Sequence, residues 1–158
     1  MKKKKELVKQ LKDLILKGNA HVTLEDAVAG VPGELAGVVP EGLPYSLWQL
    51  LEHIRIAQND ILEFSRNARH KSPEWPEGYW PREAAPKKKT AWSASLKQIL
   101  KDRDAFIDLL EADDADLYTP FAHGDGQNLL REALLLADHA AYHTAEIIVI
   151  RRLLGNWE

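Results

Sequence analysis

Apolar residues recur at intervals of three and four positions along four long stretches of this chain, and this spacing constrains its fold more than any other feature. Such spacing places one apolar stripe along one side of an α-helix. The stretches cover approximately residues 4–17, 45–69, 90–112 and 126–154. No segment shows the alternation of apolar and polar residues that is typical of a strand. The sequence therefore predicts one all-α domain, a four-helix bundle over residues 1–158.

The segments between these helices carry clear start and stop signals. Ser46, followed by Gln49, forms a capping-box pattern at the start of the second long helix, and Thr23 is placed to cap a short helix over residues 23–29. Residues 30–44 contain three prolines and four glycines, and residues 70–89 are rich in proline and tryptophan. These long connecting loops allow either a crossover between helices or a cap over one end of the bundle.

Composition excludes several classes of function. The chain has no cysteine, so disulfides and thiolate ligands are excluded, and a metal would have to be held by His, Asp or Glu. The net charge of −3 gives no general attraction to nucleic acid, and the lysines at 2–5 are interpreted as the solvated start of a helix. No apolar run approaches the roughly 18 residues of a membrane span. We therefore expect a cytoplasmic protein with neither a nucleic-acid nor a membrane partner.

Six histidines are present, and their placement divides them into two groups. Three lie in the predicted loops, where we expect them to face solvent: His21, His70 and His123. The other three share the apolar stripes of the second and fourth long helices and point toward the same interior: His53, His139 and His143.

Buried imidazoles need polar partners, because an unsatisfied buried polar group costs about 1–3 kcal/mol. His139 and His143 are four residues apart, so both rings can reach one ion, and His53 can complete a three-histidine site from the facing helix. Ordinary core or surface histidines are the alternative interpretation. The pattern is not that of a zincin, because Ala140 stands where His-Glu-x-x-His requires glutamate.

Two segments carry a resemblance to a known family. "LWQLLEHIRIAQNDILEF" and "ADHAAYHTAEIIVIRRLLG" resemble the DinB-like superfamily of metal-binding four-helix bundles, and the resemblance covers nearly the whole chain. It implies that His53, His139 and His143 bind a divalent ion, most often nickel or zinc, with iron or manganese as further possibilities. It also implies a homodimer. Characterised relatives include transferases and isomerases that use bacillithiol, mycothiol or glutathione.

The site and the resemblance together predict a metal-dependent hydrolase or thiol-dependent S-transferase that acts on a small-molecule substrate, with a low-molecular-weight thiol as one candidate. A non-catalytic, metal-binding stress-response bundle is the alternative, because no catalytic residue can be identified. Gln49, Asp60 and Glu146 lie one or two turns from a histidine, so each could orient a ligand ring or simply face outward. Arg103 interrupts the apolar stripe of the third long helix. It could bind an anionic substrate group, pair with a carboxylate such as Asp60, or extend to solvent at the bundle edge.

The aromatic residues of the second long loop can be interpreted in two ways. Trp75, Tyr79 and Trp80 lie among prolines, which makes a stiff apolar segment. They would form a lid or pocket wall, or they would seal one end of the bundle or a dimer contact.

Overall fold

The computed structural model describes residues 2–158, and all regular elements in this range are helices. The elements are α1 (Lys2–Lys17), α2 (Leu24–Val28), α3 (Leu47–Arg66), the 3-10 turn η1 (Glu77–Tyr79), α4 (Ala91–Glu111) and α5 (Leu129–Leu153). The predicted all-α bundle of four long helices is confirmed. The boundaries of α3 lie two to three residues inside the predicted range of 45–69, and η1 was not predicted.

Side-chain caps fix where the helices begin. The Thr23 hydroxyl accepts a hydrogen bond from the Asp26 backbone amide at the start of α2. Ser46 and Gln49 form the predicted capping box at the start of α3. α5 begins at Leu129, slightly later than expected, because the Asn128 side chain caps it by accepting from the amide of Arg131.

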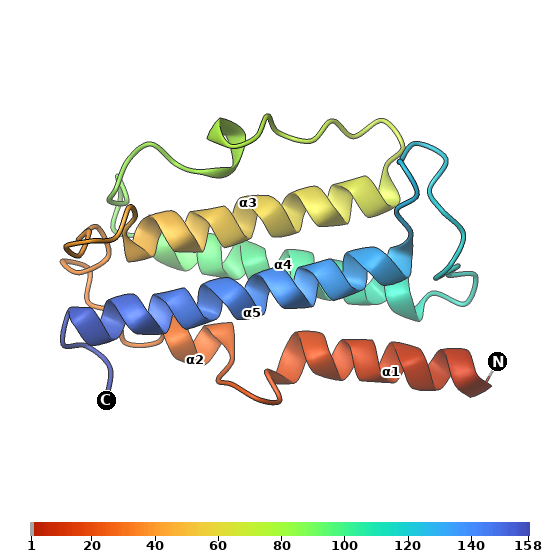
Figure 1. Cartoon of the computed structure of the whole chain (residues 1–158), viewed down its shortest axis with the longest axis horizontal. Coiled ribbons are helices and arrows are strands. Elements are labelled where there is room, and N and C mark those ends of the chain that lie inside the picture. The colour runs from red at the N-terminus through yellow and green to blue at the C-terminus, as the bar shows by residue number, and fades with distance from the viewer. Residues whose placement is uncertain (1) are drawn as a thin grey trace.

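The long loop between α3 and α4 is a crossover. Figure 1 shows that residues 67–90, which we name the crossover loop, return along the full length of α3, so that α4 runs parallel to α3. α5 then runs antiparallel to both. α1 and α2 lie end to end along α5 and together form the fourth layer. The lengths of the connecting loops allowed either a crossover between helices or a cap over one end of the bundle. The crossover loop has the first of these arrangements.

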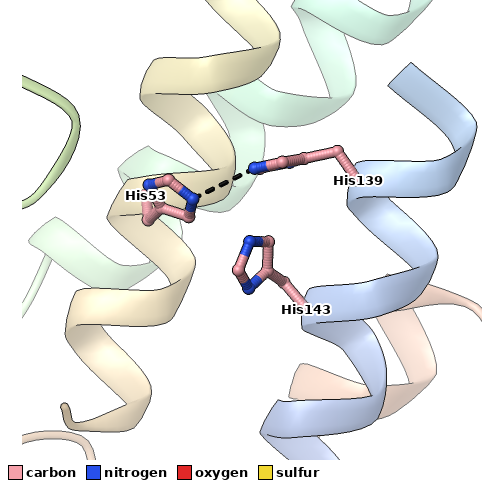
Figure 2. Close-up of side chains that lie close together, drawn as sticks. All are labelled: His53, His139 and His143. Atoms are coloured by element: carbon pink, nitrogen blue, oxygen red, sulfur yellow. Dashed lines mark hydrogen bonds between the residues drawn. The ribbon is translucent and has the colours of Figure 1, made fainter. Parts of the chain in front are cut away.

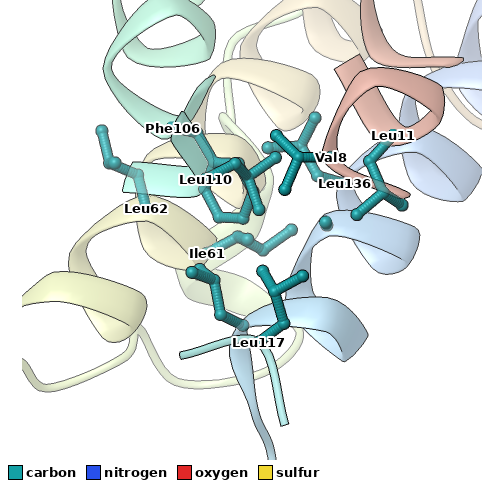
Figure 3. Packing of buried hydrophobic residues seen from close by; sticks show 10 residues of the cluster. Val8, Leu11, Ile61, Leu62, Phe106, Leu110, Leu117 and Leu136 are labelled. Carbon is teal, nitrogen blue, oxygen red and sulfur yellow. The ribbon is translucent and has the colours of Figure 1, made fainter. Parts of the chain in front are cut away.

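The apolar core is divided into two clusters along the bundle axis. One cluster, shown in part in Figure 3, includes Leu11, Leu62, Phe106 and Leu136. The other consists of Ala27, Val28, Leu47, Leu50, Leu51, Ile54, Ile99, Ile147 and Ile150. On α5 the two clusters are separated by the segment that carries the two histidines. The histidines therefore lie between two apolar layers.

No apolar run of the length of a membrane span was expected, but α5 is, by length and composition, long and apolar enough to cross a membrane. It packs against α1, α2 and α3 and buries the charged residues Glu132 and Arg151. The core helix of a bundle passes the same test of length and composition, and the packing of α5 is that of a core helix.

Candidate metal centre

The three predicted histidines come together between α3 and α5. Each of His53, His139 and His143 offers one ring nitrogen, and these nitrogens all lie within 4.8 Å of one another. Nε2 of His139 lies 3.0 Å from Nε2 of His53. Figure 2 shows His53 reaching from α3 toward the two rings that α5 contributes. The spacing of four residues puts the α5 pair on one face of the helix, as the sequence predicted.

In His53 and His143, the ring nitrogen that points away from the other histidines forms a hydrogen bond. This bond determines which nitrogen faces the centre of the group. Nδ1–H of His53 donates to the backbone carbonyl of Tyr79 at 3.0 Å. Nδ1–H of His143 donates to Oε2 of Glu146 at 2.6 Å. A histidine that donates from Nδ1 has its lone pair on Nε2, which is the form that binds a metal.

Burial keeps the group ready to bind a cation. His53 is buried, with 2% of its surface exposed, and this burial lowers its pKa below the ordinary value of 6.5. Burial also lowers the pKa of His139 to about 3, and the neighbouring His143 and His53 contribute to the same shift. Both rings are therefore neutral near pH 7. The 3.0 Å contact between two ring nitrogens requires a proton or a metal ion between them, because two lone pairs repel.

The crossover loop holds His53 from the outside. Trp80 stacks on the His53 ring with centroids 3.9 Å apart and planes 4° apart. The Tyr79 hydroxyl donates to Asp60 at 2.6 Å, and the ring of His70 bonds the other oxygen of Asp60 at 2.7 Å. Asp60 thus ties the loop to α3, and the carbonyl of Tyr79 is held against His53. Tyr79 and Trp80 both contact His53, whereas Trp75 is 70% exposed.

A second set of hydrogen bonds, through Glu146 and Tyr45, holds the ring of His143. Glu146 accepts from His143 with one carboxylate oxygen, and its other oxygen accepts a short hydrogen bond from the hydroxyl of Tyr45. Tyr45 also stacks on Trp80 with centroids 5.3 Å apart, so the two supports are in contact. The expectation that Glu146 could orient a ligand ring is met by this hydrogen bond.

Replacing Glu146 by alanine is expected to lower the affinity for a divalent metal by about 10- to 100-fold, because partners of this kind fix the tautomer and direction of a ligand ring. Glu146→Gln keeps an acceptor for His143 and should lose less. Titration of the metal-free protein with Zn²⁺ against a competing chelator measures this. Glu111→Ala, an exposed α4 carboxylate paired with Lys12, is the matched control. An unchanged affinity in Glu146→Ala would contradict the assignment.

Other predicted residues have different positions from those expected. Gln49 bonds the carbonyl of Pro81 as well as its own cap, so it anchors the crossover loop and contacts no histidine ring. Arg103 pairs with a bundle carboxylate, but this is Glu25 of α2 at 2.7 Å and not Asp60. His70 was expected to face solvent, but it is half-buried against Asp60.

The other two loop histidines behave as expected. His21 and His123 are exposed. Tyr79 was singled out for its aromatic side chain, but it acts on His53 through its backbone carbonyl, which no side-chain pattern reveals. Tyr45 was missed by sequence reasoning, and it reaches Glu146 from a position 101 residues away in the chain. The only sequence signal for Tyr45 was its place just before the cap of α3.

Chemically, the donor set fits a divalent ion. Three imidazole nitrogens suit a divalent transition-metal ion, and the group of possible ligands in residues 2–158 contains no carboxylate. Metal-binding histidines usually donate their other ring N–H to an outer partner. His53 and His143 do so through Nδ1, to the Tyr79 carbonyl and to Glu146.

Comparison with known proteins agrees with this geometry. The family model of the DinB superfamily matches residues 19–147 of the 158, a range that includes all three histidines. No curated protein and no solved structure matches the chain. The match covers most of the sequence, from the residues before α2 into the second half of α5. The helical bundle and the clustered histidines of this chain fit a metal-binding protein of the DinB superfamily. The chain belongs to the DinB superfamily.

Proposed function

We propose that this protein is a metal-dependent enzyme, either a hydrolase or a thiol-dependent S-transferase, that binds its ion through His53, His139 and His143. The observation that carries the proposal is the donor set, three imidazoles without a carboxylate in the described residues. Closed structural sites usually have four protein ligands, whereas catalytic sites have three and keep a position open. A divalent ion, nickel or zinc in the first place, would act as a Lewis acid and lower the pKa of a bound water or thiol.

The protein's own residues have supporting roles in this proposal. The carbonyl of Tyr79 and the carboxylate of Glu146 hold two rings in the tautomer that presents Nε2. The indole of Trp80 covers one face of His53 and excludes water from it. Asp60 and Glu146, the carboxylates that bond to the supports of His53 and to His143, both have hydrogen-bond partners already. No side chain is thereby assigned as a general base, which favours a nucleophile that the ion itself activates.

The test compares two reactions of the zinc- or nickel-loaded protein. One assay follows conjugation of glutathione, bacillithiol or mycothiol to an electrophile, and the other follows hydrolysis of activated ester and amide substrates. We expect one of the two reactions to proceed faster than with His139→Ala at equal protein concentration. If the protein binds a stoichiometric metal ion and accelerates neither reaction over that variant, the ion is structural or sensory and the enzymatic proposal is wrong.

A further inference from the structure

A small cavity enters the bundle where α1 and α2 meet end to end. Gly18, directly after α1, has a φ of +62°, and an added Cβ there would lie 2.4 Å from the carbonyl oxygen of His21. The sharp turn at this position therefore requires glycine. Residues 18–23 then loop away from α5 before α2 begins (Figure 1). α1 and α2 thus do not form one continuous cover over α5.

Small side chains on α5 leave room at this junction. The cavity has a volume of about 60 Å³, and its α5 wall includes Ala137, Ala140, Ala141 and Thr144. An apolar cavity of about 150 Å³ holds benzene, so about 60 Å³ corresponds to two or three non-hydrogen atoms. None of the three candidate metal ligands lines the cavity, which makes it a site separate from the metal centre.

The cavity is lined by an ion pair that is only partly satisfied. Nη1 of Arg103 donates to Oε1 of Glu25 at 2.7 Å. Within residues 2–158, Nε of Arg103 and Oε2 of Glu25 are buried and have no hydrogen-bond partner. Arginine–carboxylate pairs frequently form two parallel hydrogen bonds, but this pair forms one. A buried donor and a buried acceptor without partners destabilise the fold unless a further molecule satisfies them.

The two unpaired atoms define the chemistry of such a molecule. Nε–H of Arg103 requires an acceptor, and the carboxylate oxygen of Glu25 requires a donor. The ion pair is neutral as a whole, so an anion would be repelled by Glu25 and a cation by Arg103. A primary amide group has three non-hydrogen atoms and supplies one acceptor and two N–H donors. The apolar side chains of Leu14, Ile15 and Leu136 also line the cavity and suit a short alkyl chain.

We propose that this cavity binds a small neutral molecule with a primary amide head group. The amide oxygen accepts from Nε–H of Arg103, and the amide N–H donates to Oε2 of Glu25. Because so few atoms make contact, the dissociation constant is expected to be about 1 mM or weaker. Water molecules offer the same donors and acceptors, so the experiment has to separate an amide site from a hydrated cavity. The proposal does not depend on metal binding.

NMR titration of the full chain with propionamide tests this site, because the Nε–H of arginine gives a resonance of its own. The Arg103 resonance should shift and saturate at millimolar propionamide. Propionate and propylammonium have similar shapes but carry charge, and each should bind at least about tenfold more weakly. Ala137→Leu fills the cavity without altering the ion pair and should also weaken propionamide binding at least about tenfold. Ala94→Leu, at an exposed position on α4, is the matched control and should bind like the wild type.

A second variant covers the case in which Ala137→Leu does not fold, as judged by circular dichroism. Arg103→Lys keeps the positive charge beside Glu25 but lacks Nε–H, so it should weaken propionamide binding to a similar extent. Here the shifts are followed at the backbone amides of residues 137–144.

Three outcomes would overturn the amide site: no saturable shift, equal binding of propionate, or unchanged affinity in the folded variants. A nuclear Overhauser contact between Arg103 Nε–H and water that persists in excess propionamide would show a cavity that holds water only, which also overturns it. Metal affinity is measured separately. Loss of metal binding in a variant that still binds propionamide would count against the metal proposal and not against this site.

Discussion

Alanine in place of His139 is expected to remove the bound divalent metal while leaving the bundle folded. His139 offers one of the three candidate ligand nitrogens, and within residues 2–158 its side-chain hydrogen bond is the contact with His53. Loss of a ligand should cost more than the 10- to 100-fold that loss of an outer partner costs, so we expect at least about 100-fold weaker binding. Mass spectrometry of metal in the untagged protein, followed by Zn²⁺ and Ni²⁺ titration, measures the effect.

Thermal unfolding gives an independent readout of the same variant. A ligand present at 100 times its dissociation constant stabilises the native state by about 2.7 kcal/mol. For a chain of this size that corresponds to a rise in Tm of roughly 5–10 °C. The rise should occur in the wild type, disappear with a chelator, and be absent in His139→Ala. His123→Ala, in an exposed loop, is the matched control and should respond like the wild type. An equal rise in Tm for His139→Ala would rule out His139 as a ligand.

The helices and the histidine group were predictable because both depend on local spacing. The stripes with intervals of three and four residues located the four long helices. The capping residue Ser46 fixed the start of the second of them, and Thr23 fixed the start of the short helix α2. The same register placed His53, His139 and His143 in the interior. Any two inward-facing positions at similar heights on adjacent helices lie close together, so the convergence required no knowledge of the loops.

The supports of the group were not predictable in the same way. The crossover loop has no periodicity, so its sequence does not show that it returns along α3 and places Trp80 on His53. The carbonyl of Tyr79 is a backbone group and carries no residue-type signal. For Arg103 the sequence offered Asp60 as a partner, yet the guanidinium pairs with Glu25 of α2. Pairings of this kind depend on where a short helix packs, which is a tertiary property.

The histidine group lies between two apolar clusters, and this position lowers the stability of the metal-free protein. Burying neutral imidazoles removes their contact with water. Both ring nitrogens of His53 have partners, in Tyr79 and His139, but the hydrogen bond of His143 to Glu146 compensates for only one of its nitrogens. Bundles usually fill such a layer with apolar side chains. A layer that retains polar residues at a cost in stability is characteristic of a functional site.

This cost leads to a specific pH dependence: the metal-free protein should lose stability on acidification through its buried histidines. Burial lowers the pKa of His139 to about 3 and that of His53 below its ordinary value, whereas both titrate near 6.5 in the unfolded chain. Between pH 6.5 and about 3 the unfolded chain therefore binds more protons than the native protein. The stabilising contribution is complete above pH 6.5 and is lost as the pH falls, by up to about 1.4 kcal/mol per pH unit for each histidine.

Urea unfolding at pH 7 and pH 5, in the presence of a chelator, measures this contribution. His139 alone should account for a loss of about 2 kcal/mol over that interval, because pH 5 lies one and a half units below its unfolded pKa. His139→Ala removes the titrating group, so its stability should fall less steeply with pH than that of the wild type. If wild type and His139→Ala have the same slope, His139 is already accessible to protons in the native state, and the buried, neutral donor on which the metal centre depends is not present.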